Sequence, residues 1–273
     1  MCRSEGVTLT NRAKEIRKTI LEVANRARSP HIGSALSCAD ILSALYFEVL
    51  DIPKDMESFD KRDIFLLSKA HSAMALYATL YHKGFLSQEQ LVGYYKNTLP
   101  AHTDRQTCPY IEISAGSLGH GLPIGVGMAL ALRGEKNNQG KQRKVCVLMG
   151  DGEAQEGSVW EAAMFAPKYQ LEHLIAIIDR NNLQGYGRAS ELLSYEPIDE
   201  KWKAFGWNTQ RVDGHSENAI KEAIVANEGS GIPLCLICDT IKGKGVSFME
   251  DELKWHYFLV TDEILAESLK ELQ

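Results

Sequence analysis

Residues 144–182 read KVCVLMGDGEAQEGSVWEAAMFAPKYQLEHLIAIIDRNN, and they contain two short apolar runs separated by a helix candidate. The runs VCVLM and LIAIID are rich in aliphatic and β-branched residues, which is typical of strands buried on both faces. The segment SVWEAAMFAPKYQ between them has the character of a helix. Strands joined through a helix predict a parallel pair, so this stretch indicates a βαβ unit.

The same alternation continues on either side of this unit. Toward the C-terminus, the patterns predict helix 198–206, strand 208–214, helix 217–228 and strand 234–240. Toward the N-terminus, they predict a helix from Leu9 to Ala27, a loop over 29–36, a helix capped by Ser37, a strand over 63–68 and a helix over 72–83. Gly84 is expected to end that last helix, Ser87 and Gln90 to form a capping box, and the turn 115–121 to lead into a helix over 123–134.

These elements predict an α/β fold in which a parallel sheet is flanked by helices. We expect a single domain over 1–273, with an irregular C-terminal extension from about residue 243. In sheets of this kind, ligands bind beyond the carboxyl ends of the strands. Two strand ends, Gly150-Asp151-Gly152 and Asn181-Asn182, are therefore the first places to look for a functional site.

The composition is that of an ordinary globular protein, with 44% hydrophobic and 24% charged residues in 273 positions. A net charge of −6 argues against nucleic acid or an anionic membrane surface as a partner, because phosphates are held by clustered Lys and Arg. No apolar run approaches the roughly 20 residues that a membrane span needs. The N-terminal segment lacks the apolar stretch of a signal peptide, so we expect a cytoplasmic protein.

The six cysteines are scattered along the chain, and we expect reduced thiols. Cys235 and Cys238 form a CxxC, a spacing that can indicate zinc or redox chemistry. Here it lies in PLCLICD, which reads as a buried strand, so the two thiols would face opposite sides of a sheet. Since no second Cys/His pair accompanies them, we interpret both as core residues.

Asp151 and Asn181 form the first candidate site. Each follows a predicted strand, and the ends of neighbouring parallel strands meet at one edge of the sheet. Taken singly, Asp or Asn at a strand end more often shapes a turn or caps a helix. Together they can offer two oxygen ligands to one cation, with the Leu183 carbonyl as a third. This set suits Mg²⁺, which usually completes its shell with phosphate oxygens and water, so the motif predicts a diphosphate-bearing cofactor.

Residues 150–184 resemble the thiamine diphosphate-binding signature in the form found in transketolases. The segments SPHIGS, LLSKAHSAMALYA, GSLGHGLPIGVGMALA and TIKGKGVSF also resemble transketolase segments, in the same order. The resemblance covers nearly the whole chain and implies the diphosphate-binding domain of the thiamine diphosphate-binding fold. It implies Mg²⁺, replaceable by Ca²⁺ or Mn²⁺, at Asp151, Asn181 and the Leu183 carbonyl. It places the cofactor against Gly116, Ser117, Leu118, Gly150, Asp151, Gly152, Glu153, Asn181, Lys242 and His256.

The resemblance also implies roles for four of the eight histidines. His31, His71, His102 and His256 match positions of catalytic histidines and would converge around the reacting carbon and the substrate hydroxyls. Imidazoles near neutral pH can exchange protons with sugar hydroxyls and stabilise developing alkoxides. Glu156 matches a glutamate at the subunit interface that links paired active sites. His120 is left unassigned. Three further histidines are interpreted as structural: His82, His173 and His215.

From the resemblance, we expect this chain to lack the second domain that transketolases require. In that family, the glutamate that activates the cofactor and the pocket for its pyrimidine ring belong to this second domain. We therefore expect a separate partner chain, two copies of each subunit in an α2β2 assembly, and activity only in the complex. The reaction implied is transfer of a two-carbon ketol unit from a ketose, such as a sugar phosphate, to an aldose.

Two segments depart from the family pattern. SPHIGS stands where SGHPG is usual, and Tyr257 follows His256 where the family has a glycine. These changes favour an unusual ketose, such as a branched or sulfonated one, as strongly as a pentose phosphate. Two other assignments remain open: the α-subunit of a 2-oxo acid dehydrogenase first component, and a regulatory subunit without catalysis. Deoxyxylulose-phosphate synthase is a nearer relative, but its chain is normally continuous.

Overall fold

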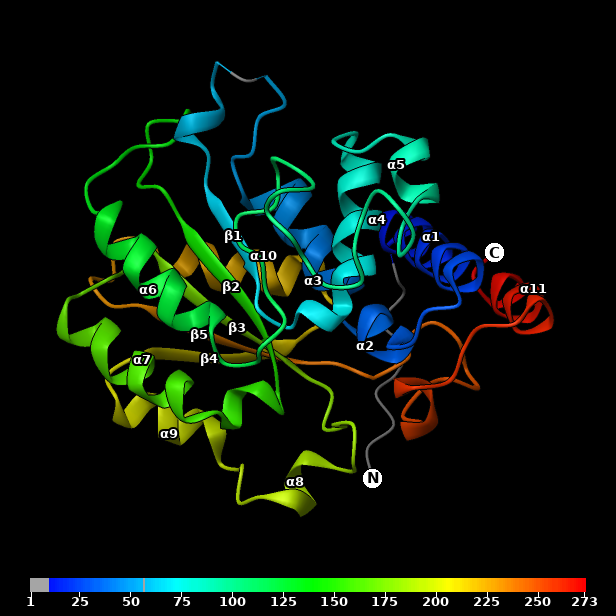
Figure 1. Cartoon of the computed structure of the whole chain (residues 1–273). Helices are drawn as coiled ribbons and strands as arrows, with labels where there is room; N and C mark the ends of the chain where they lie inside the picture. The colour runs from blue at the N-terminus through cyan, green and yellow to red at the C-terminus, as the bar shows by residue number, and fades with distance from the viewer. Residues whose placement is uncertain (1–9, 56) are drawn as a thin grey trace.

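The computed structural model describes residues 10–55 and 57–273 and has one parallel sheet at its centre (Figure 1). Its five strands lie in the order β1-β2-β3-β5-β4, and every neighbouring pair is parallel. This confirms the predicted α/β class. The strands are β1 (Ile64–Leu67), β2 (Val145–Gly150), β3 (Leu174–Arg180), β4 (Asn208–Asp213) and β5 (Leu234–Asp239).

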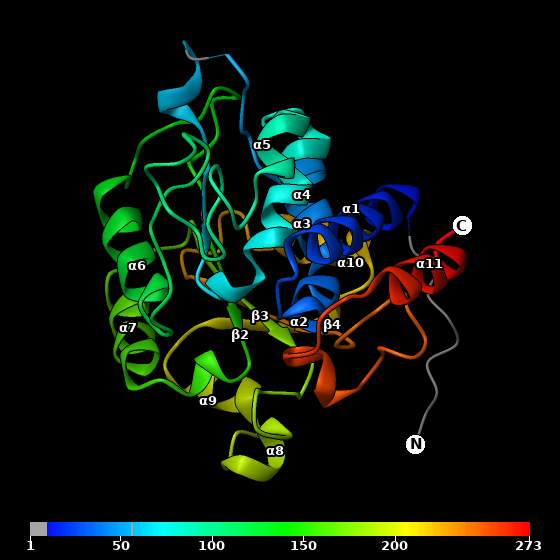
Figure 2. The same ribbon diagram turned by 45° about the vertical axis from the view of Figure 1, so that its right-hand side comes forward.

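Helices cover both faces of the sheet (Figures 1 and 2). One layer contains α1 (Asn11–Ala27), α2 (Ile32–Ser37), α3 (Ala39–Ala44), α4 (Ala73–Lys83) and α10 (Glu217–Ala226). The other contains α6 (Gly121–Ala131), α7 (Gly157–Lys168) and α9 (Ile198–Ala204). Shorter helices are η1 (Leu45–Val49), η2 (Phe59–Lys61), η3 (Ala70–Ser72), α5 (Gln88–Val92), η4 (Glu153–Gln155), α8 (Ala189–Leu192) and η5 (Leu253–His256). Within the described ranges, we find no helix that combines the length and the apolar character of a membrane span.

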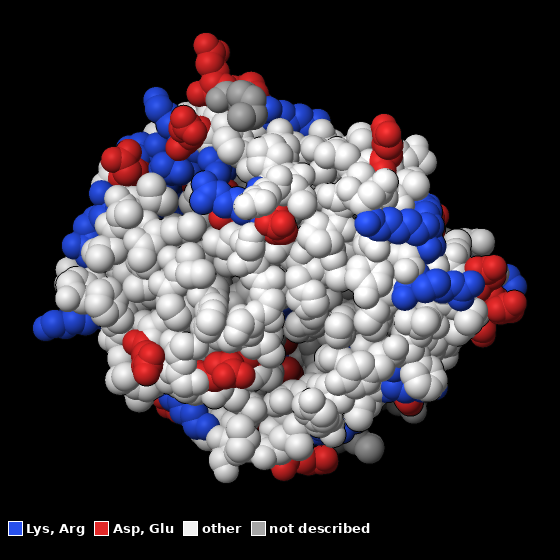
Figure 3. Space-filling model, viewed as in Figure 1, with Lys and Arg blue, Asp and Glu red and all other residues white. Residues whose placement is uncertain are grey.

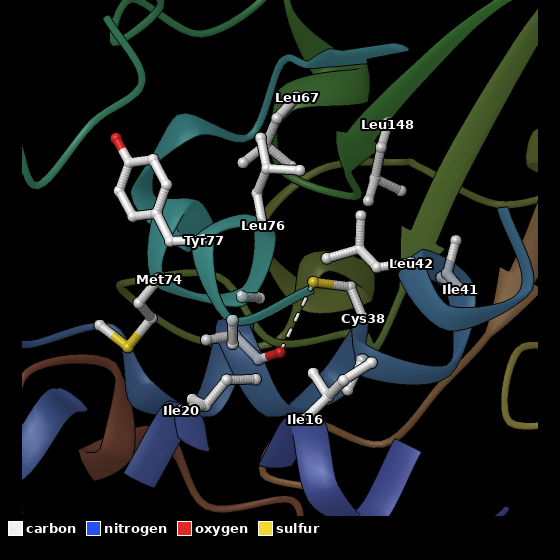
Figure 4. Close-up of a cluster of buried hydrophobic side chains, with 14 of the residues drawn as sticks. Ile16, Ile20, Cys38, Ile41, Leu42, Leu67, Met74, Leu76, Tyr77 and Leu148 are labelled. Carbon is white, nitrogen blue, oxygen red and sulfur yellow. Dashed lines mark hydrogen bonds between the residues drawn. The ribbon is translucent and has the colours of Figure 1, made fainter. Parts of the chain in front are cut away.

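Alternate strand residues point into opposite layers, as the pleat requires. Leu148 packs with α1, α3 and α4 in the core drawn in Figure 4, whereas Val147 packs with α6 and α7. Cys238 belongs to the first core and Cys235 to the second, and both thiols are free and buried. The CxxC therefore serves core packing, as the strand pattern predicted.

The region after α1 differs from the prediction. Residues 29–36 were expected to be a loop, but α2 already begins at Ile32. Ser37 does not cap a helix: it is the last residue of α2, and its hydroxyl donates to Asp179 Oδ2 at 2.6 Å. A buried acceptor on β3 thus uses the hydroxyl that would otherwise cap a helix. Leu9 lies outside the described residues, and α1 begins with Thr10 as its N-cap.

The C-terminal segment is more regular than expected. After residue 243 it contains η5 and α11 (Asp262–Glu271), whose N-cap is Thr261. α11 packs beside α1, so this segment returns to the N-terminal helix (Figure 2). Two smaller predictions are confirmed, because Gly84 ends α4 in a left-handed conformation and Ser87 forms a capping box with Gln90.

Candidate functional site

A cavity of about 400 Å³ lies at the carboxyl edge of the sheet. Its walls come from the segments that follow β1, β2, β3 and β5, together with the loop between α5 and α6, the start of α2 and the end of η5. Register pairs Gly150 of β2 with Asp179 of β3, so the two predicted strand ends are neighbours. Figure 3 shows a hollow between the positions of α2 and α8, in a face where most side chains are uncharged.

Four histidines from distant parts of the sequence meet in this cavity. The His31 ring centroid lies 5.4 Å from His71, 6.4 Å from His102 and 5.0 Å from His256. His71 and His256 are 6.0 Å apart. The structure thus brings together the histidines that the sequence singled out, while their catalytic roles stay predictions.

His31 has an unusual backbone conformation. With φ of 71° and ψ of 21°, it occupies the left-handed region just before α2. This conformation costs a side chain with a Cβ on the order of 1 kcal/mol, and such strain concentrates at functional sites. The His31 N–H donates to the His256 carbonyl at 3.0 Å. This backbone bond ties the start of α2 to the end of η5 beside the cavity.

The environment favours neutral imidazoles at His31, His71 and His256. Burial lowers the pKa of His31 to about 4, with smaller contributions from His102 and Lys242. Burial and the Lys242 ammonium lower the pKa of His256 to about 3. Burial also holds the pKa of His71 well below its usual value. At neutral pH these rings can therefore each donate one hydrogen bond and accept another.

Asp151 has the clearest unsatisfied group in the cavity. Its Oδ1 accepts a hydrogen bond from the Gly152 N–H at 2.8 Å, whereas its Oδ2 is buried without a partner. Burial, followed by the nearby Asp179 carboxylate, raises the pKa of Asp151 to about 6. An unpaired buried carboxylate oxygen is costly and calls for a cation or an ordered water.

The other two predicted cation ligands lie in the turn after β3. Asn181 Oδ1 accepts from the Leu183 N–H at 3.1 Å, which leaves a second lone pair available. The Leu183 carbonyl accepts from the Lys242 ammonium at 2.8 Å. Lys242 Nζ also donates to His256 Nδ1 at 2.9 Å, which places the ring hydrogen of neutral His256 on Nε2. The Lys242 ammonium is therefore already hydrogen-bonded to the Leu183 carbonyl, one of the oxygens predicted to bind the cation.

A buried ion pair at the wall of the cavity was not predicted. The Lys69 ammonium donates to Asp179 Oδ2 and, at 3.1 Å, to the Ser34 carbonyl. Burial alone would raise the pKa of Asp179, but the Lys69 charge outweighs it and holds this pKa below its usual range. Lys69 follows β1 much as Asp151 follows β2. Extending the search to this third strand end would have identified it.

Glu153 and Glu156 occupy different environments. Glu153 is buried, and its carboxylate accepts from the Ser68 hydroxyl, from the Gly119 N–H at 3.0 Å and from the Gly150 N–H at 3.3 Å. These bonds hold the turn before α6 against the ends of β1 and β2. Glu156 is exposed and lines the cavity.

Most of the predicted site residues line the cavity. Ser117 does not, although Gly116 and Leu118 do. The lining also contains residues for which no cofactor or catalytic role was predicted: Ser34, Lys69, Gln184, Gly185, Tyr186 and Tyr257. The ring centroids of Tyr257 and His256 lie 4.6 Å apart. Because Tyr257 also lines the cavity, the bulky residue noted in the sequence does reach the pocket.

The family model for the thiamine diphosphate-binding domain of transketolase matches residues 9–270. The chain belongs to the transketolase family. This confirms the resemblance drawn from the sequence motifs and, with it, the thiamine diphosphate-binding fold.

Transketolase subunits of similar length are among its relatives. The chain is 41% identical over 268 residues to an apulose-4-phosphate transketolase subunit of Phocaeicola vulgatus, covering 97% of this chain and 94% of that protein. It is 38% identical over 272 residues to a 6-deoxy-6-sulfo-D-fructose transketolase subunit of a Clostridium species, covering 98% of each. These matches confirm at the level of the family that the chain is a transketolase-type enzyme subunit.

Solved transketolases share the fold over a part of their length. The Leishmania mexicana transketolase superposes with a TM-score of 0.86 and 27% identity, over 95% of this chain but 40% of that one. The Campylobacter jejuni transketolase gives the same TM-score and identity over 97% of this chain and 43% of its own. The chain therefore spans about two fifths of these structures.

Proposed function

We propose that the chain is the Mg²⁺- and thiamine diphosphate-binding subunit of a split transketolase. With a separate partner chain, it would transfer a two-carbon ketol unit from a ketose to an aldose. The observation that carries this proposal is the unpaired, buried Oδ2 of Asp151, which lies in a histidine-lined cavity at the edge of a transketolase-family sheet. Family membership supplies the reaction class.

The donor set fits a hard cation. Asp151 Oδ2, Asn181 Oδ1 and the Leu183 carbonyl are oxygen ligands of the kind that Mg²⁺ prefers. Among the described residues, no group of three or more His, Cys, Asp or Glu side chains could hold a metal ion. The cation would therefore depend on diphosphate oxygens and water to complete its shell. The cofactor itself would lie along Gly116, Ser117, Leu118, Gly150, Gly152, Glu153 and Lys242.

Thiamine diphosphate, when bound, supplies the chemistry that breaks and forms a carbon–carbon bond next to a carbonyl. The chain's own residues would handle the sugar. Neutral His31 and His71 can each donate one hydrogen bond and accept another, which suits a hydroxyl-rich substrate. Neutral His256 can donate from Nε2, since its Nδ1 already accepts from Lys242. Together with His102, they would orient the ketose and stabilise negative charge that develops on its oxygens.

A partner chain is supported by the lengths of the relatives. Subunits of similar length carry the name transketolase, whereas the chain spans only 40% of the Leishmania mexicana enzyme. We infer that the partner contributes the pyrimidine-binding domain and that two copies of each chain form an α2β2 heterotetramer. The exposed Glu156 beside the cavity fits the interface position inferred for it.

An unusual ketose is the substrate class that we favour. The names of two relatives specify apulose-4-phosphate and 6-deoxy-6-sulfo-D-fructose. In this chain, Tyr257 packs beside His256 and lines the pocket, which changes its shape next to the histidine cluster. Both observations agree with the departures noted in the sequence.

Calorimetry tests the cofactor site directly. We expect thiamine diphosphate to bind the full chain in the presence of Mg²⁺ and to lose affinity when the cation is chelated. Asp151→Ala should abolish binding while leaving the sheet folded, as followed by circular dichroism. Unchanged affinity in this variant would remove Asp151 from the site. Absence of Mg²⁺-dependent binding to the wild type, both alone and with the partner chain added, would favour the regulatory subunit instead.

A further inference from the structure

The strap, residues 240–245, connects β5 to the C-terminal segment and carries Lys242 into the cavity. The Lys242 side chain is 1% exposed, and its ammonium touches the Leu183 carbonyl and His256. Its position therefore depends on how the strap backbone is held. Three residues that do not line the cavity contact the strap or one another: Arg17, Asp40 and His215.

These three side chains form a buried polar network. Arg17 donates from Nη1 to Asp40 Oδ1 at 3.1 Å and from Nη2 to Asp40 Oδ2. His215 Nδ1 lies 2.7 Å from Asp40 Oδ2. Arg17 and Asp40 are completely buried and His215 is 6% exposed. They come from α1, α3 and the turn before α10, which are distant in the sequence.

The hydrogen-bond partners determine the tautomer of His215. The Ile241 N–H donates to His215 Nε2 at 2.9 Å. Because an amide N–H can only donate, Nε2 must carry a free lone pair. The hydrogen of the neutral ring is then on Nδ1, where Asp40 accepts it. The ring thus links a buried carboxylate to the backbone amide that precedes Lys242.

The network is hydrogen-bonded to the strap backbone on both sides of Lys242. Beyond the Ile241 contact, Arg17 Nε donates to the Lys244 carbonyl at 2.9 Å. A buried Arg–Asp pair seldom stabilises a fold more than apolar residues of the same volume would. Geometry is therefore a better explanation than stability for placing these charges under the strap.

We propose that Arg17, Asp40 and His215 are positioning residues for Lys242, because they hold its backbone where the ammonium can reach the diphosphate. This inference rests on the proposed function, because it assigns the network to the same site. Partners of this kind, which orient a ligand-contacting group without touching the ligand, typically affect affinity about tenfold or more.

Two substitutions of His215 separate the network's two contacts. His215→Gln places an amide near Nε2 and can still accept from the Ile241 N–H, whereas His215→Asn places an amide near Nδ1 and keeps only Asp40. We expect His215→Gln to retain wild-type affinity for magnesium thiamine diphosphate in calorimetry, and His215→Asn to lose about tenfold. Equal affinities in the two variants, whether retained or lost, would overturn the inference.

Hydrogen exchange at the Ile241 amide provides a measurement that needs no cofactor. We expect this amide to stay protected in His215→Gln and to exchange faster in His215→Asn, relative to the global unfolding of each variant.

His173→Gln is the matched control, because His173 is another buried histidine, bonded to the Ala129 carbonyl at 2.7 Å and remote from the strap. It should lower stability without changing affinity or Ile241 exchange. A wild type that binds no cofactor would contradict the proposed function alone, and equal Ile241 exchange in both His215 variants would contradict the inference.

Discussion

Asp151 is held in an environment that disfavours its charge. It is 3% exposed, and one of its oxygens has no partner. Its pKa is about 6 in the folded chain, against 3.8 for an unperturbed aspartate. The contribution of this carboxyl to the free energy of unfolding is therefore fully present below pH 3.8, where it is protonated, and is lost as the pH rises through 6.

Asp151→Asn should stabilise the cofactor-free chain at pH 8. One pKa unit corresponds to about 1.4 kcal/mol, so the rise of the Asp151 pKa from 3.8 to about 6 predicts an increase of about 3 kcal/mol in the free energy of unfolding in urea. The gain should shrink below pH 6, where the aspartate of the wild type becomes protonated. A variant no more stable than the wild type at pH 8 would show that nearby groups already offset the cost of burying the Asp151 carboxylate.

The histidine cluster predicts the opposite dependence on pH. His31 has a folded pKa of about 4 against 6.5 for the unperturbed group, so between these values the unfolded chain binds more protons than the folded chain. The free energy of unfolding should therefore fall as the pH drops from 6.5 toward 4. In His31→Gln, chemical denaturation over this range should give a flatter dependence.

His120→Gln is the control for that series, because His120 is exposed and lies outside the cavity lining. It should follow the wild type at every pH. If His31→Gln were as steep as the wild type, His31 would have to titrate alike in the folded and unfolded chains.

At the scale of the element, the start of α6 is packed tightly against the end of β1. A Cβ added to Gly121 would lie 2.4 Å from Ser68 Cβ and 3.0 Å from Ser68 Cα. Ser68 also bonds Glu153 and the Gly121 N–H, so it cannot move freely. We expect Gly121→Ala to lower the free energy of unfolding by about 1–3 kcal/mol, measured by urea denaturation.

Gly127 provides a control in the same helix. A Cβ there meets nothing within 4 Å. Gly127→Ala should therefore stabilise the chain by about 0.5–1 kcal/mol, since alanine is the better helix former. If the two substitutions had the same effect, the close approach at Gly121 would not be a constraint.

The strands could be predicted from the sequence because their signal is local. Apolar runs bounded by turn residues identify β2, β3 and β5 without knowledge of their partners. Ser37 could not be assigned in this way, because its hydroxyl is bonded to Asp179, 142 positions away. α11 has a local signal in its Thr261 cap, although an irregular segment was expected there.

At the scale of the whole molecule, parallel strand order explains why the site could be anticipated. Asp151 and Asn181 follow neighbouring strands, so topology alone brings them to one edge. The network under the strap has no such signal. Arg17 and His215 meet at Asp40 across 23 and 175 positions, a contact that only the packing of α1, α3 and α10 determines.

The isolated chain should show no ketol transfer. In our proposal, this chain provides the cation and diphosphate site, and the partner supplies the pocket for the pyrimidine ring. We expect a coupled assay with a ketose donor and an aldose acceptor to register activity only after the partner chain is added. Asp151→Ala mixed with the partner should stay inactive, and appreciable turnover by this chain alone would contradict the split enzyme.

The most direct test of the proposed cofactor site is a crystal structure of the chain with thiamine diphosphate and Mg²⁺. We expect one cation bonded to Asp151 Oδ2, Asn181 Oδ1, the Leu183 carbonyl and the diphosphate, with the Lys242 ammonium displaced from that carbonyl. A cofactor bound elsewhere, or an empty cavity in which these three oxygens point apart, would contradict it.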